Sequence, residues 1–109
     1  MNLIFRKKFY NFKLSTKVKN SKNTYLTKSG WIIKLISNDK KTGFGEVSPL
    51  FEEDLKKCAK QLNMIPEYVE LFNLSEQINI FHPCIQSAIN SALAEINGKI
   101  IFKEKYYFE

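Results

Sequence analysis

The chain contains few of the residues that crosslink a polypeptide or break its regular structure. Its 109 residues include two cysteines, three prolines and four glycines. Cys58 and Cys84 are far apart, and each lies among apolar residues of an expected helix. We interpret them as buried free thiols in a reducing cytoplasm, and the alternatives are a disulfide or a shared metal. No repeat or low-complexity segment is present, so we expect one principal domain.

Long apolar runs are also lacking. No stretch approaches the ~20 residues that a membrane-spanning helix needs. The first eight residues carry charge and no apolar run follows them, unlike a signal peptide. Hydrophobic residues make up 44% of the chain and aromatic residues 14%, which excludes a disordered protein. We therefore expect a cytoplasmic, folded chain with no membrane partner.

Arginine is almost absent, although the net charge is +6. Arg6 is the only arginine among 17 basic residues. The planar guanidinium group of arginine is the side chain that most often binds phosphates and base edges of nucleic acids. The lysines of this chain are also scattered along the sequence. We therefore expect no nucleic-acid partner in spite of the positive charge.

The first 47 residues predict strands. Apolar and polar residues alternate over 3–14, and the alternation slips between Phe9 and Tyr10, which suggests a bulge. Residues 15–28 are polar and are typical of a mobile loop that runs into a strand. Residues 31–36 are apolar on both faces, and 44–47 return after a turn. These segments predict a three-stranded antiparallel meander over about residues 3–47.

The following residues predict a small helical bundle, so the fold class is α+β. Ser48 is expected to cap a first helix that has Pro49 at its first position and apolar residues recurring up to 62. A short helix is expected after Pro66. A third helix is expected from Pro83 to a stop at Gly98, with one apolar stripe. The residues expected to be largely buried are Trp31, Ile33, Leu35, Leu55, Leu62, Ile85, Ile89, Leu93 and Ile96. The tail "KIIFKEKYYFE" is strand-like.

The stretch "GFGEVSPL" at 43–50 joins the two halves. It lacks the further glycines, or the lysine followed by Ser/Thr, of a phosphate loop. We expect Gly43 to end a turn, Gly45 to lie where a neighbouring group comes close, and Glu46 to be a hydrogen-bonding carboxylate on the other face. The only histidine, His82, is expected to be a capping or loop residue.

The order "SGWIIKL", "GFGEVSPL" and "PCIQSAINSALAEINGK" resembles the N-terminal capping domain of the enolase superfamily. Within the superfamily the chain is most similar to o-succinylbenzoate synthases of the menaquinone and phylloquinone pathways. Phe44 stands where these enzymes commonly have tryptophan, and Lys28 stands where arginine is common. The resemblance implies a capping domain over residues 1–99, with 100–109 as a linker or the start of a barrel that this chain does not include.

The resemblance implies that catalysis lies in that barrel, where Mg²⁺ and lysines dehydrate a cyclohexadiene carboxylate to o-succinylbenzoate. It implies no catalytic and no metal-binding residue within this chain. Its implied partners are the barrel domain and a small dicarboxylate substrate at the domain interface. The implied substrate-capping residues are Lys19, Asn20, Ser21, Lys22, Asn23, Pro49 and Leu50.

Other interpretations remain open. Muconate cycloisomerases and dipeptide epimerases carry similar caps. The chain is alternatively a stand-alone α+β module that binds another protein through an exposed apolar face. In either case apolar residues of the tail and of a barrel-facing side predict that the isolated chain self-associates.

Overall fold

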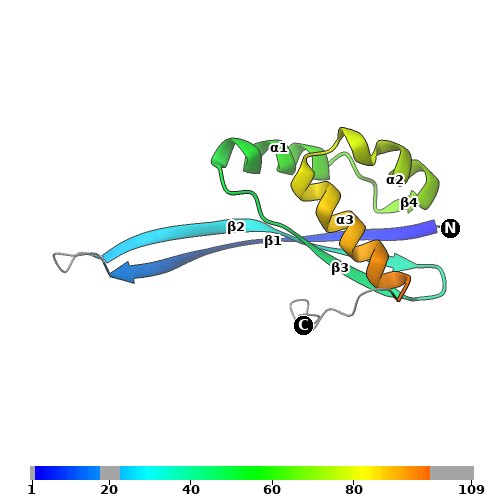
Figure 1. Cartoon of the computed structure of the whole chain (residues 1–109), viewed down its shortest axis with the longest axis horizontal. Coiled ribbons are helices and arrows are strands. Elements are labelled where there is room, and N and C mark those ends of the chain that lie inside the picture. Colours follow the sequence, from blue (N-terminus) through cyan, green and yellow to red (C-terminus); the bar gives the residue numbers. More distant parts are fainter. Residues whose placement is uncertain (1, 18–22, 99–109) are drawn as a thin grey trace.

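The structure is a computed structural model that describes residues 2–17 and 23–98 of the chain. It is an α+β fold, as predicted, with a four-stranded antiparallel sheet in the order β3-β2-β1-β4. The strands are β1 (Asn2–Lys17), β2 (Asn23–Ser37), β3 (Thr42–Val47) and β4 (Tyr68–Glu70). The helices lie over one face of this sheet, and the β1–β2 hairpin extends beyond them (Figure 1).

The β1–β2 hairpin pairs without interruption from Leu3↔Ser37 to Lys17↔Asn23. The bulge expected at Phe9 and Tyr10 is therefore wrong, because these residues lie on opposite faces of a regular strand. The strands also include most of 15–28, which was expected to be a mobile loop running into a strand. Backbone pairing does not require apolar side chains, and the threonines and tyrosine of this segment favour strands.

The turn between β2 and β3 contains a residue with a left-handed backbone conformation. Lys40 has φ 65°, and its N–H donates to the Ser37 carbonyl over 2.9 Å. Gly43 was expected to end this turn but lies inside β3. Gly43 and Gly45 instead face helix α3 (Pro83–Ile96), where a Cβ on either would overlap the backbone at Ala92 or Ala88.

Two further helices precede α3. Helix α1 (Glu52–Leu62) begins after Phe51, so the expected cap at Ser48 is wrong and Ser48 and Pro49 belong to the connection from β3. The segment after Pro66 forms β4 and then α2 (Leu71–Gln77), followed by the 3₁₀ turn η1 (Ile78–Ile80). Gly98, with φ 73°, follows α3 as predicted. Within the described ranges, no helix is both long and apolar enough to cross a membrane.

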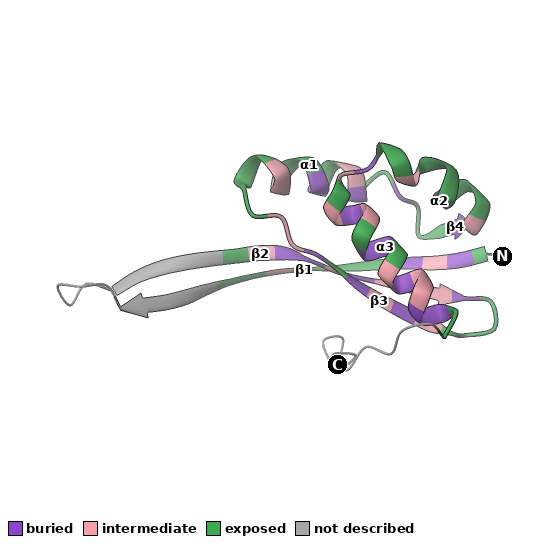
Figure 2. Cartoon of the chain, in the orientation of Figure 1, coloured by how far each residue is buried: buried purple, intermediate pink, exposed green. Residues whose placement is uncertain are grey.

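The core lies between the helices and the sheet, and α3 packs chiefly against β3 and β2 (Figure 2). The helices thus form a layer on the sheet rather than a separate bundle. Leu55 and Leu93, expected to be largely buried, lie at the margin of the core and are partly exposed. The other residues expected in the core are buried: Trp31, Ile33, Leu35, Leu62, Ile85, Ile89 and Ile96.

Candidate functional site

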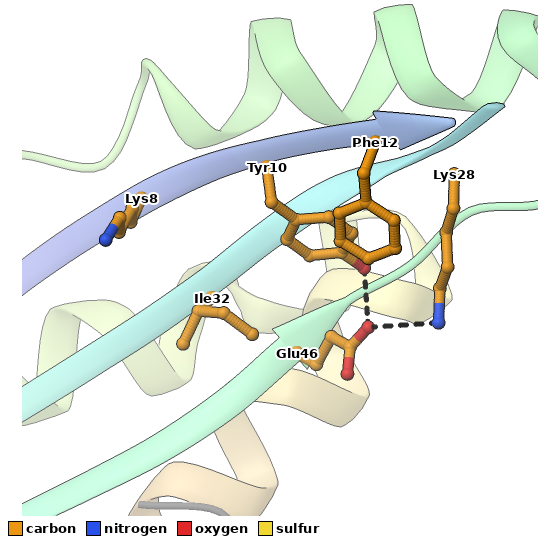
Figure 3. Close-up of a pocket in the computed structure, with 6 residues that line it drawn as sticks. All are labelled: Lys8, Tyr10, Phe12, Lys28, Ile32 and Glu46. Carbon is orange, nitrogen blue, oxygen red and sulfur yellow. Dashed lines mark hydrogen bonds and ion pairs between the residues drawn. The ribbon is translucent and has the colours of Figure 1, made fainter. Parts of the chain in front are cut away.

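A hollow of about 250 Å³ lies on the sheet face opposite the helices (Figure 3). Successive strand residues point to opposite faces, so the even-numbered residues of β1, β2 and β3 share this outer face. Six of them line the hollow: Lys8, Tyr10, Phe12, Lys28, Ile32 and Glu46. The hollow is therefore formed by three strands that are distant in the sequence.

The Tyr10 side chain determines the shape of the hollow. Tyr10 pairs directly with Gly30 on β2, and a Cβ on Gly30 would lie 2.6 Å from the Tyr10 hydroxyl oxygen. Glycine thus leaves room for the tyrosine to cross β2. The Tyr10 hydroxyl then donates to Glu46 Oε2 on β3 over 2.5 Å, as Figure 3 shows. The Phe12 ring stacks on Tyr10 with 5.4 Å between ring centroids.

Glu46 also forms an ion pair with Lys28, whose Nζ lies 3.9 Å from Glu46 Oε2. Both side chains are close to half exposed, so the pair adds little to stability. Its importance is positional, because it holds the carboxylate and the ammonium at one edge of the hollow. Lys28 and Glu46 belong to the two segments that carry the resemblance, "KSGW" and "GFGE". Glu46 thus has the predicted role of a hydrogen-bonding carboxylate on the face opposite Gly45.

Lys8 contributes the second ammonium group of the hollow. Among the side chains that the structure describes, none forms an ion pair with Lys8. The described lining residues offer ammonium, hydroxyl and carboxylate groups that can bind a polar ligand. The hollow presents positive charge beside an aromatic wall.

The predicted substrate-capping residues divide into two groups. Pro49 and Leu50 line a second hollow of about 410 Å³ between the β3–α1 connection and the hairpin, together with Asn11, Ser29, Phe51, Glu52 and Leu55. Lys19, Asn20, Ser21 and Lys22 lie outside the described residues. Asn23 is the first residue of β2 and pairs with Lys17.

Of these residues, Asn23, Pro49 and Leu50 lie toward the same end of the sheet, where β1 ends, β2 begins and β3 ends. They are not adjacent there. The Asn11↔Ser29 pair beside Pro49 and Leu50 precedes the Lys17↔Asn23 pair by six residues. At about 3.3 Å per residue this is a separation of roughly 20 Å along the hairpin.

A polar cluster joins α1 to α3. His82 caps α3, as expected, by accepting the Cys84 N–H at Nδ1 over 3.1 Å, and its Nε2 lies 3.3 Å from Asp54 Oδ1. Cys58 and Cys84 are free thiols, as predicted, but only Cys58 is buried and Cys84 is partly exposed. Burial raises the pKa of Cys58 to about 11. No group of three or more His, Cys, Asp or Glu side chains in residues 2–17 and 23–98 could hold a metal ion. The described residues therefore do not fit a magnesium site.

Comparison with models of protein families, with curated proteins and with solved structures finds no match for the chain. The enolase-superfamily resemblance therefore remains a prediction that depends on the quoted motifs.

Sequence reasoning missed four residues of the outer hollow: Lys8, Tyr10, Phe12 and Ile32. A signal for three of them was present, because Lys8, Tyr10 and Phe12 alternate at even positions of β1. The apparent slip at Phe9 hid it. Two consecutive aromatic residues indicate a bulge only if one face of the strand offers no contact for an aromatic side chain. Here Phe9 contacts Trp31, with ring centroids 5.3 Å apart, while Tyr10 crosses Gly30 on the other face.

Proposed function

We propose that the chain is the substrate-capping domain of an enzyme similar to o-succinylbenzoate synthase. The order of the fold supports this proposal: β1, β2 and β3 pair consecutively, and helices follow. The "GFGEVSPL" segment leaves the sheet at the start of the helical part, and its glutamate joins the "KSGW" lysine. The catalytic barrel would be a partner of residues 1–99.

The observation that carries the proposal is exposed apolar surface where β3 leaves the sheet. Leu50 is 91% exposed and Phe51 69% exposed, directly after the Ser48–Pro49 connection. Burying one such side chain is worth roughly 1.5–3 kcal/mol, so their exposure favours a covering partner. We call Leu50 and Phe51 together the connection patch. Pro49 and Leu50 are also residues that the resemblance places over the substrate.

A cap has a defined physical task in such an enzyme. The active site of a barrel lies at the C-terminal ends of its strands and is open to water. The connection patch would exclude water from that mouth, and Lys19 and Lys22 would attract a dicarboxylate substrate. Magnesium, held by the barrel, would stabilise negative charge during dehydration.

Two alternative functions remain. The caps of muconate cycloisomerases and dipeptide epimerases would have the same task, and the barrel would decide between these activities. A stand-alone protein-binding module is favoured by the same connection patch, since any apolar partner could cover it.

A fusion experiment tests the proposal. Residues 1–99 would replace the native cap of an o-succinylbenzoate synthase, and the fusion would be compared with the barrel alone. We expect kcat/KM for magnesium-dependent dehydration to rise on the order of 10-fold or more, because a closed site orients substrate and excludes water. Residues 1–109 alone should give no product with or without magnesium.

Matched variants separate docking from folding. Leu50→Ser and Phe51→Ser should lower the activity of the fusion, whereas Phe72→Ser on α2, where the side chain is 66% exposed, should not. Phe51 is the N-cap of α1 and makes no side-chain capping bond, so serine there improves the cap and does not unfold the helix. A fusion no faster than the bare barrel, or equal losses from all three variants, would contradict the proposal.

A further inference from the structure

We propose that the hollow on the outer sheet face binds a small aromatic carboxylate. This site is separate from the connection patch and goes beyond the capping function. The probe that represents this chemistry is naphthalene-2-carboxylate. The argument rests on the shape, the charge and the fixed geometry of the six lining residues (Figure 3).

The apolar part of the hollow fits a flat ring. Tyr10 and Phe12 stack with 22° between their planes, and Phe12 is 48% exposed, so an aromatic surface remains open. Ile32 lines the hollow between β1 and β3. Aromatic rings prefer offset or tilted contacts with other rings, which this open wall permits. A volume of about 250 Å³ is below the range of drug-sized pockets, so the occupant is small.

The charge of the hollow selects an anion. Its described lining residues supply two ammonium groups, those of Lys8 and Lys28, and one carboxylate, that of Glu46. Glu46 pairs with Lys28, whereas no described side chain forms an ion pair with Lys8. Lys8 lies at the end of the hollow away from Phe12 (Figure 3), so the carboxylate of a ligand whose ring contacts the aromatic wall would point along the hollow toward Lys8 and form a charge-assisted hydrogen bond there. A second copy of the chain would bring the same lysines against this face, which charge repulsion disfavours.

The site is also organised before any ligand arrives. Gly30 leaves space for the Tyr10 ring, and the Tyr10–Glu46 hydrogen bond fixes the end of that ring over β3. Binding therefore requires little ordering of the tyrosine, which favours affinity. A ligand of this size is expected to bind with a Kd of ~0.1–1 mM.

The first experiment titrates the full chain with naphthalene-2-carboxylate and follows backbone amide shifts by NMR. Lys8→Met should weaken binding ~5–10-fold, because it removes one charge-assisted hydrogen bond and keeps the apolar stem. Lys7→Met is the matched control. Lys7 is the preceding residue of β1, but its ammonium bonds Asn63 on the helix side, so the affinity should not change.

Glu46→Gln gives a result of opposite sign. The glutamine carbonyl still accepts the Tyr10 hydroxyl, while Lys28 is released from its ion pair. The acid should then bind several-fold more tightly. A glutamate with only a structural role would instead give weaker binding or none. 2-Naphthylmethylammonium, a cation of similar shape, should bind more weakly than the acid to every form.

Three outcomes would overturn the proposal. The first is equal affinity for the acid and for uncharged 2-naphthalenemethanol. The second is the same effect from Lys8→Met and Lys7→Met. The third is an oligothymidylate that binds this face more tightly than the acid, which would assign the face to single-stranded nucleic acid. Fusion activity does not depend on this hollow, so failure here leaves the capping proposal standing.

Discussion

Gly45 and Gly98 are required for different physical reasons. A side chain on Gly45 would overlap the backbone at Ala88, whereas Gly98 has open space but a φ of 73°. We expect Gly45→Ala to lower the free energy of unfolding by ~1–3 kcal/mol through overpacking, and Gly98→Ala by ~1–2 kcal/mol through left-handed strain. Urea denaturation measures both. Only Gly45→Ala should also shift the amide signals of β3 and α3, and shifts of similar size in both variants would contradict this assignment.

The buried thiol of Cys58 makes stability depend on pH at the alkaline end. Burial raises the pKa of Cys58 from 9.0 to about 11, so the folded chain keeps the thiol proton at pH values where the unfolded chain loses it. The resulting stabilisation is complete below pH 9 and is lost as the pH rises toward about 11. Between pH 8 and 10.5 the free energy of unfolding should fall more for the native chain than for Cys58→Ala. Equal falls would show that the thiol does not contribute.

At the scale of the elements, α3 protects the edge of the sheet. β3 is an edge strand, and its Phe44 N–H donates to Oε1 of the buried Glu95 over 3.0 Å. Glu95→Ala removes this acceptor and should lower the free energy of unfolding by ~1–3 kcal/mol. Hydrogen exchange at the Phe44 amide should accelerate in Glu95→Ala more than in Glu95→Gln, which keeps an acceptor. Unchanged exchange in both variants would exclude an edge-protecting role.

Elements with their own periodic pattern could be predicted from the sequence. Helix α3 has a continuous apolar stripe between Pro83 and Gly98, and β2 has an apolar core segment. Strand β4 could not be predicted in this way, because its three residues become a strand only by pairing with Asn2, Leu3 and Ile4 of β1. The length of the hairpin was missed for a similar reason, because its outer part is held as a strand by pairing with the opposite strand and not by an apolar pattern of its own.

The candidate site was predicted only in part. The outward direction of Glu46 follows from strand alternation and the burial of Gly45, and the capping role of His82 follows from the proline after it. The partners of Glu46 could not be predicted without knowing the register in which the strands pair. Tyr10 reaches it only because Gly30 is the residue directly opposite on β2.

At the scale of the whole molecule, the exposed apolar surface predicts self-association of the isolated chain. Leu50 and Phe51 form the connection patch, and Phe9 is 50% exposed on the hairpin. The apolar residues of 100–109 lie outside the described residues, and their contribution is a separate prediction from the sequence. We expect the sedimentation coefficient to increase with concentration, and Leu50→Ser combined with Phe51→Ser to reduce the increase. Deleting 100–109 tests the tail. A strict monomer at all concentrations would refute the prediction.

The position of α3 at the end of the described chain affects folding during synthesis. The β1–β2 hairpin is complete at Ser37, but the helix that covers Ile33 and Leu35 is complete only at Ile96. About 60 residues must be translated in between, which takes ~3–12 s at cellular elongation rates. During this interval the nascent hairpin exposes a bare apolar face beside the ribosome. We therefore expect this apolar face to be available to a chaperone until the last helix emerges.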